Sequence, residues 1–472
     1  MRNRVKNIHF VGVAGSGMSG IAEVLVNLNF QVSGSDIADG PVAERLRAAG
    51  VKVAIGHHVD NVKNTDVVVV SSAIDKSNPE VSHALDVGIP VIPRAEMLGE
   101  LMRFQQGIAV AGTHGKTTTT SLIAAILIAA GLDPTFVVGG LINSAGVNAK
   151  LGQGQYLVAE ADESDASFLN LKPEMAVVTN IDEDHMVTYQ GDLSTLKQTF
   201  VAFLQNLPFY GLAVLCADDE NVQSIRDQIH KPVLTFGFSE DADFRGYDLS
   251  QHATTMSFMV VRPNNSEDLS VTVALPGDHN VLNALAAIAI ASHLEVDDRA
   301  IVQGLTEFQG IARRFQIHGE IKLNGKNITL VDDYAHHPVE LAATLSAARG
   351  CWPERRIIAV FQPHRYSRTY DLFDDFVQVL TEQQDLLLCE VYPAGEQVIS
   401  GATGKSLCQA IRVRGASKPI FVPELEKLEF VLAPIVQQGD VIITLGAGSI
   451  GKASKQLFCN LSVATDDQDD AK

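Results

Sequence analysis

Residues 110–117 read VAGTHGKT, a glycine loop that follows one apolar run and precedes another of helical length. A strand, a glycine loop and a helix in this order form a phosphate cradle, because backbone N–H groups at the helix N-terminus face the anion. Lys116 would place its charge on the terminal phosphates, and Thr117 would offer its hydroxyl to magnesium. The pattern G-x-x-x-x-G-K-[ST] is matched imperfectly, since its first glycine falls on Val110 and Gly112 comes two residues later. An ordinary turn with a solvated lysine is the alternative interpretation.

The composition is typical of a globular protein with several domains. At 472 residues, 46% of them hydrophobic, the chain is too long for one core, and about three domains are expected. The net charge of −20 argues against a general binder of nucleic acid or of anionic membranes. The 5 cysteines form no C-x-x-C pair, which favours a reducing compartment without structural zinc. No apolar run reaches the roughly 20 residues of a membrane span, so a cytoplasmic protein is predicted.

Residues 1–105 predict a Rossmann-like domain that binds a diphosphate. An apolar strand at 8–13 leads into a G-x-G-x-x-G turn, a helix follows, and a second strand ends at Asp36. Such glycines bring a diphosphate to the helix N-terminus. The pattern also invites an NAD-dependent dehydrogenase interpretation, but that signal is weak because any diphosphate can use the turn. Asp36 also lies closer to the last glycine than the roughly 20 residues of the dinucleotide fingerprint.

Two further α/β domains are expected at residues 106–311 and 312–472. The central one is predicted to be of P-loop ATPase type with a mostly parallel sheet. Its predicted elements include strands at 156–159 and 175–179, a hairpin formed by 254–262 and 269–275, and a helix at 280–294. The last domain restarts strand–helix alternation, which predicts a Rossmann-like sheet covered on both faces, with strands at 328–331, 356–361, 385–390, 419–422 and 441–445. Its acidic end, 465–472, is predicted to be a disordered tail.

Polar residues follow the predicted strands, at the sheet edge where open α/β proteins bind ligands. Glu160 ends one strand of the central domain, and His185 follows another. Together with Thr117 they could hold magnesium or manganese against the phosphates of ATP, since both metals accept oxygen ligands and manganese also suits histidine. A solvated acidic loop around Glu160 is the alternative.

Two basic or histidine-rich stretches stand out in the last domain. Paired arginines at 313–314 and in HRYSR at 364–368 suggest carboxylate or phosphate clamps in so acidic a chain, with surface ion pairs as the alternative. The stretch DDYAHHP at 332–338 lies between a strand and a helix. Its adjacent histidines diverge, so hydrogen bonding to an anion or substrate is preferred to a second metal, with a structural helix start as the alternative.

Taken together, these motifs resemble the Mur ligase family of peptidoglycan synthesis in order and spacing, over essentially the whole chain. The segments that carry the resemblance are GTHGKTTT at 112–119, EADESD at 160–165, TNI with DH at 179–185, and GDHN at 277–280. The segments at 12–20, 332–338 and 364–369 resemble more specifically the members that add L-alanine to UDP-N-acetylmuramate. Members that recycle murein tripeptide onto the same sugar are the closest alternative.

The resemblance implies an ATP-dependent ligase that uses Mg²⁺ or Mn²⁺ and passes through an acyl phosphate. Its partners would be UDP-N-acetylmuramate and L-alanine, without nucleic acid or membrane, and the chain would be a monomer or weak homodimer. The metal ligands would be Thr117, Glu160 and His185, and the catalytic groups Lys116, Glu160, His185 and, as a possible base for the amine, His336.

The same resemblance implies three sets of binding residues. The UDP-sugar would contact Gly12, Gly15, Gly17, Asp36, His57, Ser71 and Ser72. ATP would contact Gly112, Thr113, Gly115, Lys116, Thr117, Thr118, His279, Asn280, Asn283, Arg314 and Asp332. The L-alanine pocket would be formed by Tyr334, His336, Arg365 and Arg368.

Two other classes of function remain open on sequence grounds. An NAD-dependent oxidoreductase would leave the phosphate loop, Glu160 and His185 unexplained. A nucleotide-dependent switch would bind ATP without forming an amide. Two separate phosphate-binding turns together with metal ligands favour a two-substrate enzyme over both.

Overall fold

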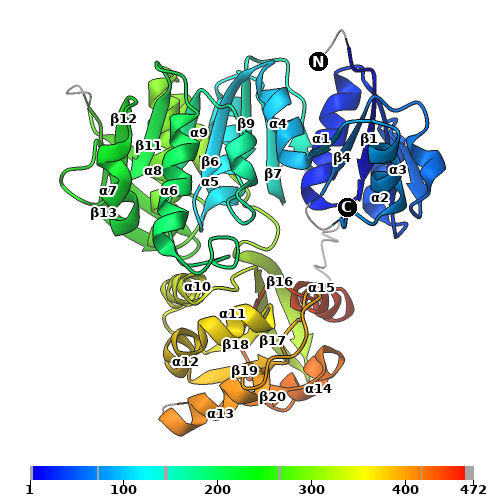
Figure 1. Cartoon of the computed structure of the whole chain (residues 1–472). Helices are drawn as coiled ribbons and strands as arrows, with labels where there is room; N and C mark the ends of the chain where they lie inside the picture. The colour runs from blue at the N-terminus through cyan, green and yellow to red at the C-terminus, as the bar shows by residue number, and fades with distance from the viewer. Residues whose placement is uncertain (1–3, 72–73, 143–146, 264–266, 416, 463–472) are drawn as a thin grey trace, which may run out of the picture. The chain divides into compact units, whose positions relative to one another are not determined.

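The structure is a computed structural model that describes residues 4–71, 74–142, 147–263, 267–415 and 417–462. Its strands form three sheets, of five, ten and six strands in chain order, with helices packed on them (Figure 1). The three-domain α/β fold expected from the sequence is confirmed. The boundaries near residues 105 and 311 stay predictions, and the expected tail lies outside the described residues.

Contacts divide the chain into two compact units. Unit 1 holds the first sheet and most of the second, and comprises Met1–Leu249, Ser257–Ala274 and Asn280–Gln309. Unit 2 holds the third sheet and comprises Ser250–Met256, Leu275–His279 and Gly310–Lys472. No helix in the described part of the chain is long and apolar enough to cross a membrane.

The first sheet has the order β3-β2-β1-β4-β5 with parallel neighbours, as in a Rossmann-like domain. Its strands are β1 (Asn7–Val11), β2 (Gln31–Asp36), β3 (Lys52–Ile55), β4 (Val67–Val70) and β5 (Val91–Pro93). Its helices are α1 (Ser16–Asn27), α2 (Pro41–Ala48), α3 (Pro79–Asp86) and α4 (Arg94–Met102). The strand order reverses between β1 and β4, which is where such sheets bind ligands. β1 ends earlier than predicted because Gly12 turns the backbone with a φ of +80°.

The second sheet has the order β15-β14-β13-β12-β11-β10-β6-β9-β7-β8. The strands are β6 (Gln106–Ala111), β7 (Thr135–Ile142), β8 (Val147–Lys150), β9 (Tyr156–Glu160), β10 (Met175–Val178), β11 (Leu212–Cys216), β12 (Val233–Gly237), β13 (Phe244–His252), β14 (Thr255–Val261) and β15 (Leu269–Val273). Its helices are α5 (Lys116–Ala129), α6 (Leu193–Gln205), α7 (Glu220–Ile225), α8 (Asp278–His293) and α9 (Asp298–Thr306). In the sheet order, each pair of neighbouring strands from β13 through β12, β11, β10, β6 and β9 to β7 is parallel. The edge strand β8 is antiparallel to β7. Both strands of the expected hairpin, β14 and β15, are neighbours in the sheet.

The third sheet has the order β16-β17-β21-β18-β19-β20. The strands are β16 (Gln316–Leu323), β17 (Lys326–Asp333), β18 (Ile357–Phe361), β19 (Asp385–Cys389), β20 (Ile420–Val422) and β21 (Val441–Leu445). Its helices are α10 (Pro338–Cys351), α11 (Tyr366–Asp371), α12 (Phe373–Thr381), α13 (Gly404–Arg414), α14 (Leu428–Leu432) and α15 (Ile450–Leu461). β16, absent from the prediction, is an antiparallel edge strand.

Both faces of the third sheet are covered, as predicted for a parallel sheet. Successive residues along β18 enter different cores: Ile358 and Val360 join one cluster, and Ala359 and Phe361 join the other. The cluster that contains Ala359 and Phe361 also includes Leu345 of α10 and Phe376 of α12, which cover that face of the sheet. The continuous apolar run of β18 is therefore explained by burial on both faces.

Candidate active site

The phosphate loop between β6 and α5 has a shape that requires glycine at two positions. Gly112 and Gly115 have φ angles of +133° and +82°, a region that side chains rarely adopt. A Cβ on Gly112 would lie 2.0 Å from Oγ1 of Thr179, and a Cβ on Gly115 would lie 2.4 Å from Oδ1 of Asn283. Asn283 Nδ2 in turn donates to Oδ1 of Asn280 at 3.2 Å. Of the two α8 asparagines expected in the ATP site, Asn283 therefore packs against the loop and Asn280 lies beside Asn283.

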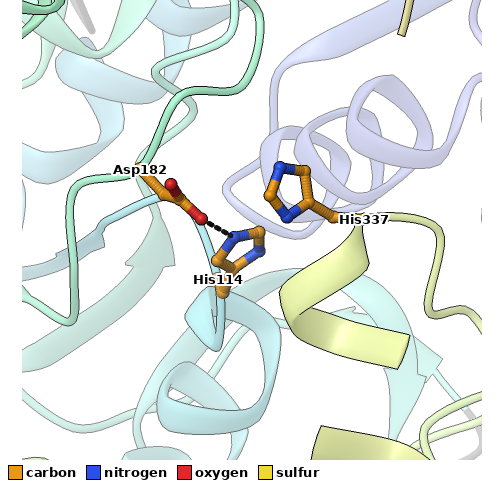
Figure 2. A group of neighbouring side chains, drawn as sticks. All are labelled: His114, Asp182 and His337. Carbon is orange, nitrogen blue, oxygen red and sulfur yellow. Dashed lines mark hydrogen bonds and ion pairs between the residues drawn. The ribbon is translucent and has the colours of Figure 1, made fainter. Parts of the chain in front are cut away.

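Residues after β10 fasten this loop. His114 N donates to Oδ1 of Asn180 at 2.8 Å, and the His114 carbonyl accepts from Oγ1 of Thr179 at 2.6 Å. Nε2 of His114 lies 3.1 Å from Oδ2 of Asp182 (Figure 2). Figure 2 also draws His337, a residue of unit 2 that caps α10. Side chains that follow β10 therefore hold the geometry of the loop.

Other loop residues expected to bind ATP lie on the same turn. Oγ1 of Thr113 accepts from the backbone N–H of Asp182 at 2.9 Å. Thr118 is buried in the first turn of α5. These contacts give Thr113 a structural role in the loop beside its expected one.

Lys116 begins α5 and bends back over its own loop. Its Nζ donates to the carbonyls of Gly112 at 2.6 Å and Thr113 at 3.0 Å, and it lies 2.7 Å from a carboxylate oxygen of Glu163. Burial alone would lower the pKa of Lys116, but the carboxylates of Glu163, Asp162 and Glu160 raise it. Burial raises the pKa of Glu163 to about 7, against the opposing charge of Lys116. Lys116 is thus a cation aimed at the loop, and Glu163 would compete with a phosphate for it.

Thr117 and Glu160 are brought together as predicted. Oγ1 of Thr117 donates to Oε1 of Glu160 at 2.8 Å, and the other carboxylate oxygen accepts from the N–H of Gly139. β9 lies beside β6, with Glu160 in register with Val110, so the carboxylate arrives at the start of the loop. A hydroxyl and a carboxylate are hard oxygen donors, which fit a magnesium or manganese ion.

His185, the third expected metal ligand, lies in the loop after β10. Its φ of +55° is unusual for a residue other than glycine, and its Nε2 lies 3.5 Å from Oδ2 of Asp184. Backbone strain of this kind is frequent at functional sites. Its assignment to the metal stays a prediction.

The first glycine turn follows β1 and leads into α1. The N–H of Gly12 donates to the carbonyl of Ser35, and the N–H of Ala14 donates to Oδ2 of Asp36, both at 2.9 Å. Gly15 caps α1 without a side-chain hydrogen bond, and the first helical turn carries no acidic residue. The helix N-terminus is therefore open to an anion. Asp36, expected to touch the nucleotide, braces the turn itself.

His57 belongs to a buried polar network that centres on Glu80, a residue the sequence analysis did not identify. Glu80 is fully buried, and its carboxylate accepts from Oγ of Ser35 and Nδ2 of Asn61 and lies 3.2 Å from Nδ1 of His57. Burial alone would raise the pKa of Glu80, but the nearby His9 and hydrogen bonds from Ser35 and Asn61 lower it to about 2. Glu80 is therefore a buried carboxylate that fixes His57 at the edge of the first sheet.

Replacing Glu80 with glutamine is expected to lower the free energy of unfolding and to flatten its pH dependence. Since the folded pKa of about 2 is below the ordinary value of 4.5, the carboxylate contributes fully above pH 4.5 and loses this contribution as pH falls toward 2. A shift of this size corresponds to roughly 3 kcal/mol. Urea unfolding between pH 7 and pH 3 measures it, with the exposed Glu44→Gln on α2 as control. Identical slopes in both variants would contradict the account.

One cavity joins the two glycine turns within unit 1. Gly15, Gly17, Ser71, Arg94, Lys116 and Glu160 are among its lining residues. Ser71 therefore lies where the UDP-sugar was expected, and Ser72 lies outside the described residues. The cavity places a helix N-terminus that suits a diphosphate beside a loop that suits the phosphates of ATP.

In unit 2, Arg314, which is expected to contact ATP, lies with Arg313 against the ring of Tyr334. The guanidinium groups of Arg313 and Arg314 lie 4.9 and 5.2 Å from the centre of the Tyr334 ring. Arg313 Nε donates to Oδ2 of Asp332 at 3.1 Å, and Thr444 Oγ1 donates to the other oxygen at 2.9 Å. Asp332, expected to bind ATP, thus also has partners inside the fold.

His364, which the sequence analysis did not assign, contacts two of the residues expected to form the L-alanine pocket, His336 and Arg368. The ring centres of Tyr334 and His336 are 5.3 Å apart, and those of His336 and His364 are 6.0 Å apart. Nη1 of Arg368, a buried side chain, donates to the carbonyl of His364 at 3.3 Å. Arg365 has a strained φ of +71° and lies 3.5 Å from Glu396. Burial lowers the pKa of His364 to about 3, so this ring is neutral at physiological pH.

His279 is the second residue of α8, in the GDHN segment. Burial lowers its pKa to about 4, with Glu340 opposing the shift and Arg314 adding to it. The side chain is therefore a neutral imidazole at pH 7. A neutral ring suits the expected position near an adenine better than a second positive charge would.

Three family models match consecutive parts of the chain. They are described as "Mur ligase family, catalytic domain", "Mur ligase middle domain" and "Mur ligase, glutamate ligase domain", and they match residues 7–106, 110–291 and 313–448.

Solved structures of three bacterial ligases are similar. The UDP-N-acetylmuramate-alanine ligase of Thermotoga maritima is 30% identical, over 97% of this chain and 99% of that chain, with a TM-score of 0.81. A murein peptide ligase of Psychrobacter arcticus is 25% identical, over 96% and 98% of the two chains, with a TM-score of 0.70. The UDP-N-acetylmuramate:L-alanyl-gamma-D-glutamyl-meso-diaminopimelate ligase of Neisseria meningitidis is 29% identical, over 66% of this chain and all of its own, with a TM-score of 0.59.

Proposed function

This chain belongs to the Mur ligase family, and from that premise we propose that it joins L-alanine to the lactyl carboxylate of UDP-N-acetylmuramate. The family consists of ATP-dependent ligases of peptidoglycan biosynthesis. The proposed reaction would run in the cytoplasm, in a monomer or weak homodimer, with Mg²⁺ or Mn²⁺. Ligation of a murein tripeptide to the same sugar is the second candidate, favoured by the likeness to the Psychrobacter arcticus enzyme.

The observation that carries this proposal is the cavity shared by the two glycine turns. Gly15 and Gly17 line one side, and Lys116 and Glu160 line another. A sugar nucleotide held by its diphosphate at α1 would extend toward a γ-phosphate held at α5. Neither an oxidoreductase nor a nucleotide switch needs two phosphate sites on one cavity.

The first chemical step brings two anions together. An oxygen of the lactyl carboxylate attacks the γ-phosphorus of ATP, the bond to the β-phosphate oxygen breaks, and ADP leaves with the electron pair. Lys116 would neutralise the transferring phosphoryl group, and Thr117 with Glu160 would hold the metal. When bound, the divalent ion supplies further neutralisation of the phosphate charge. Glu163 would give up part of its hold on Lys116 to the incoming phosphates.

The second step forms the amide from the acyl phosphate. The uncharged α-amine of L-alanine attacks the acyl carbon, the C–N bond forms, and inorganic phosphate leaves. His336 is proposed as the base that takes the amine proton. Its Nδ1 lies 3.1 Å from the carbonyl of Tyr334, which can only accept, so a proton on Nδ1 would leave Nε2 as the nitrogen that takes the amine proton. Arg368 would bind the carboxylate of L-alanine.

Replacing Arg368 with alanine is expected to raise the KM for L-alanine by roughly 10- to 100-fold, the range of a charge-assisted hydrogen bond. The KM for ATP should change far less. Steady-state kinetics with each substrate varied in turn measures both, with the exposed Arg414→Ala on α13 as control. Equal damage to both KM values would assign Arg368 to a phosphate clamp instead.

Formation of the acyl phosphate is tested by following an oxygen atom from the lactyl carboxylate into inorganic phosphate. UDP-N-acetylmuramate labelled with ¹⁸O in its carboxylate should yield inorganic phosphate that carries one labelled oxygen when ATP and L-alanine are present. UDP-N-acetylglucosamine, which lacks the lactyl group, should give no amino-acid-dependent phosphate. Unlabelled phosphate released together with an amide product would contradict the proposed route.

A further inference from the structure

Arg94 is a charged residue of the shared cavity that neither the motifs nor the resemblance singled out. It begins α4 directly after β5, at the same edge of the first sheet as the glycine turn. We propose that Arg94 binds the diphosphate of the UDP-sugar, together with the N-terminus of α1. This inference rests on the proposed function and adds to it the side chain that provides the positive charge.

The contact between Arg94 and Gly17 is the main evidence. A Cβ on Gly17 would lie 2.3 Å from Nη1 of Arg94 and 3.0 Å from its Cζ. Real Cβ contacts are essentially never shorter than 3.0 Å, so any other residue at position 17 would displace the guanidinium. The guanidinium therefore lies against the first turn of α1 at Gly17. This is where a diphosphate would accept hydrogen bonds from the backbone.

The charge of Arg94 is only weakly compensated. Among the residues that the structure describes, its hydrogen-bond partner is Oδ2 of Asp162, at 3.4 Å from Nη2. The two side chains are 26% and 41% exposed, and an ion pair of this length and exposure contributes little. A guanidinium carries five N–H donors in a planar fork that matches phosphate oxygens. Arg94 therefore has donors available for a ligand in the cavity.

The competing explanation for the position of Arg94 is a purely structural ion pair with Asp162 that joins two parts of unit 1. Arg94 lies in the first α/β segment and Asp162 follows β9 of the central sheet, so their contact could simply support packing. The two explanations differ in what they require of Asp162. If the ion pair is only structural, removing either partner should have the same effect. If Arg94 binds the diphosphate, affinity for UDP should fall when Arg94 is removed and should hold or rise when Asp162 no longer competes for the guanidinium.

Titration calorimetry of the full chain with UDP, UDP-N-acetylglucosamine, UDP-N-acetylmuramate and uridine tests the proposal. Arg94→Ala should raise the Kd for UDP and the UDP-sugar at least tenfold, while Asp162→Asn should leave it unchanged or lower it. Uridine, which has no phosphate, should bind all variants alike. Arg103→Ala, at the exposed end of the same helix, is the matched control. Thermal unfolding of each variant verifies that the fold is retained.

Gly17→Ala gives an independent test of the contact. The added methyl should displace the guanidinium and raise the Kd for UDP as Arg94→Ala does, and the double variant should be hardly worse than either single one, because both remove the same interaction.

Any one of the following results would overturn the proposal. They are an unchanged Kd in Arg94→Ala, an equal loss for uridine, and additive effects of the two substitutions. A loss seen with UDP-N-acetylmuramate but not with UDP would also overturn it, and would assign Arg94 to the lactyl carboxylate. If the unaltered protein binds none of the uridine compounds, the proposed function fails instead.

Discussion

Replacing Lys116 with alanine is expected to abolish ligation, with kcat lowered by roughly 10³-fold, the upper range for loss of one preorganised electrostatic group. Binding of the UDP-sugar should remain within about twofold, because α1 and the first glycine turn are separate from α5. The physical reason is that Lys116 is the one lysine or arginine in the phosphate loop. Phosphate release and calorimetry with the UDP-sugar measure the two quantities.

This variant needs a control for the buried carboxylate it leaves behind. Nζ of Lys116 lies 2.7 Å from Glu163, whose side chain is only 4% exposed, and an unpaired buried charge is destabilising. The double variant Lys116→Ala/Glu163→Gln removes both charges, and it should recover stability without recovering ligation. Lys172→Ala, an exposed lysine of the same unit, should behave as the unaltered chain. Ligation at a near-normal rate in Lys116→Ala would show that the phosphate-loop assignment is wrong.

Replacing Glu160 with glutamine is expected to lower kcat by roughly 10²-fold or more and to raise the magnesium concentration needed for half-maximal rate. The amide oxygen can still accept from Thr117 Oγ1, now 2.8 Å from Glu160, so the fold should be kept while the negative charge is lost. Rates measured across a magnesium titration test this. Glu183→Gln, an exposed acid in the loop after β10, is the matched control. An unchanged magnesium dependence in Glu160→Gln would remove Glu160 from the metal site.

The elements that could be predicted from sequence are those with a local cause. The strand, loop and helix around Gly115 follow from apolar runs and from a glycine at a positive φ, both visible within a few residues. β18 and β21 were predictable because burial on both faces makes a continuous apolar run. β16 was missed because half of an edge strand is solvated and its pattern is weak.

The residues missed in the site depend on partners far away in the sequence. Glu80 is stabilised by Ser35, 45 residues earlier, and Arg94 meets Asp162, 68 residues later. No local pattern distinguishes such residues from the solvated acids and arginines that are common on helices. Glu163 was visible within the acidic run at 160–165, but only the fold shows that this acid, and not its neighbours, is buried against Lys116.

The most direct test of the account is phosphate release from ATP and magnesium with UDP-N-acetylmuramate, compared among L-alanine, the murein tripeptide and no acceptor. The account predicts release that depends on L-alanine, with a product heavier by one alanyl residue in the mass spectrum. Release that depends on the tripeptide would assign the chain to the recycling reaction. No release with any acceptor, from a protein that binds ATP, would contradict the proposed ligation altogether.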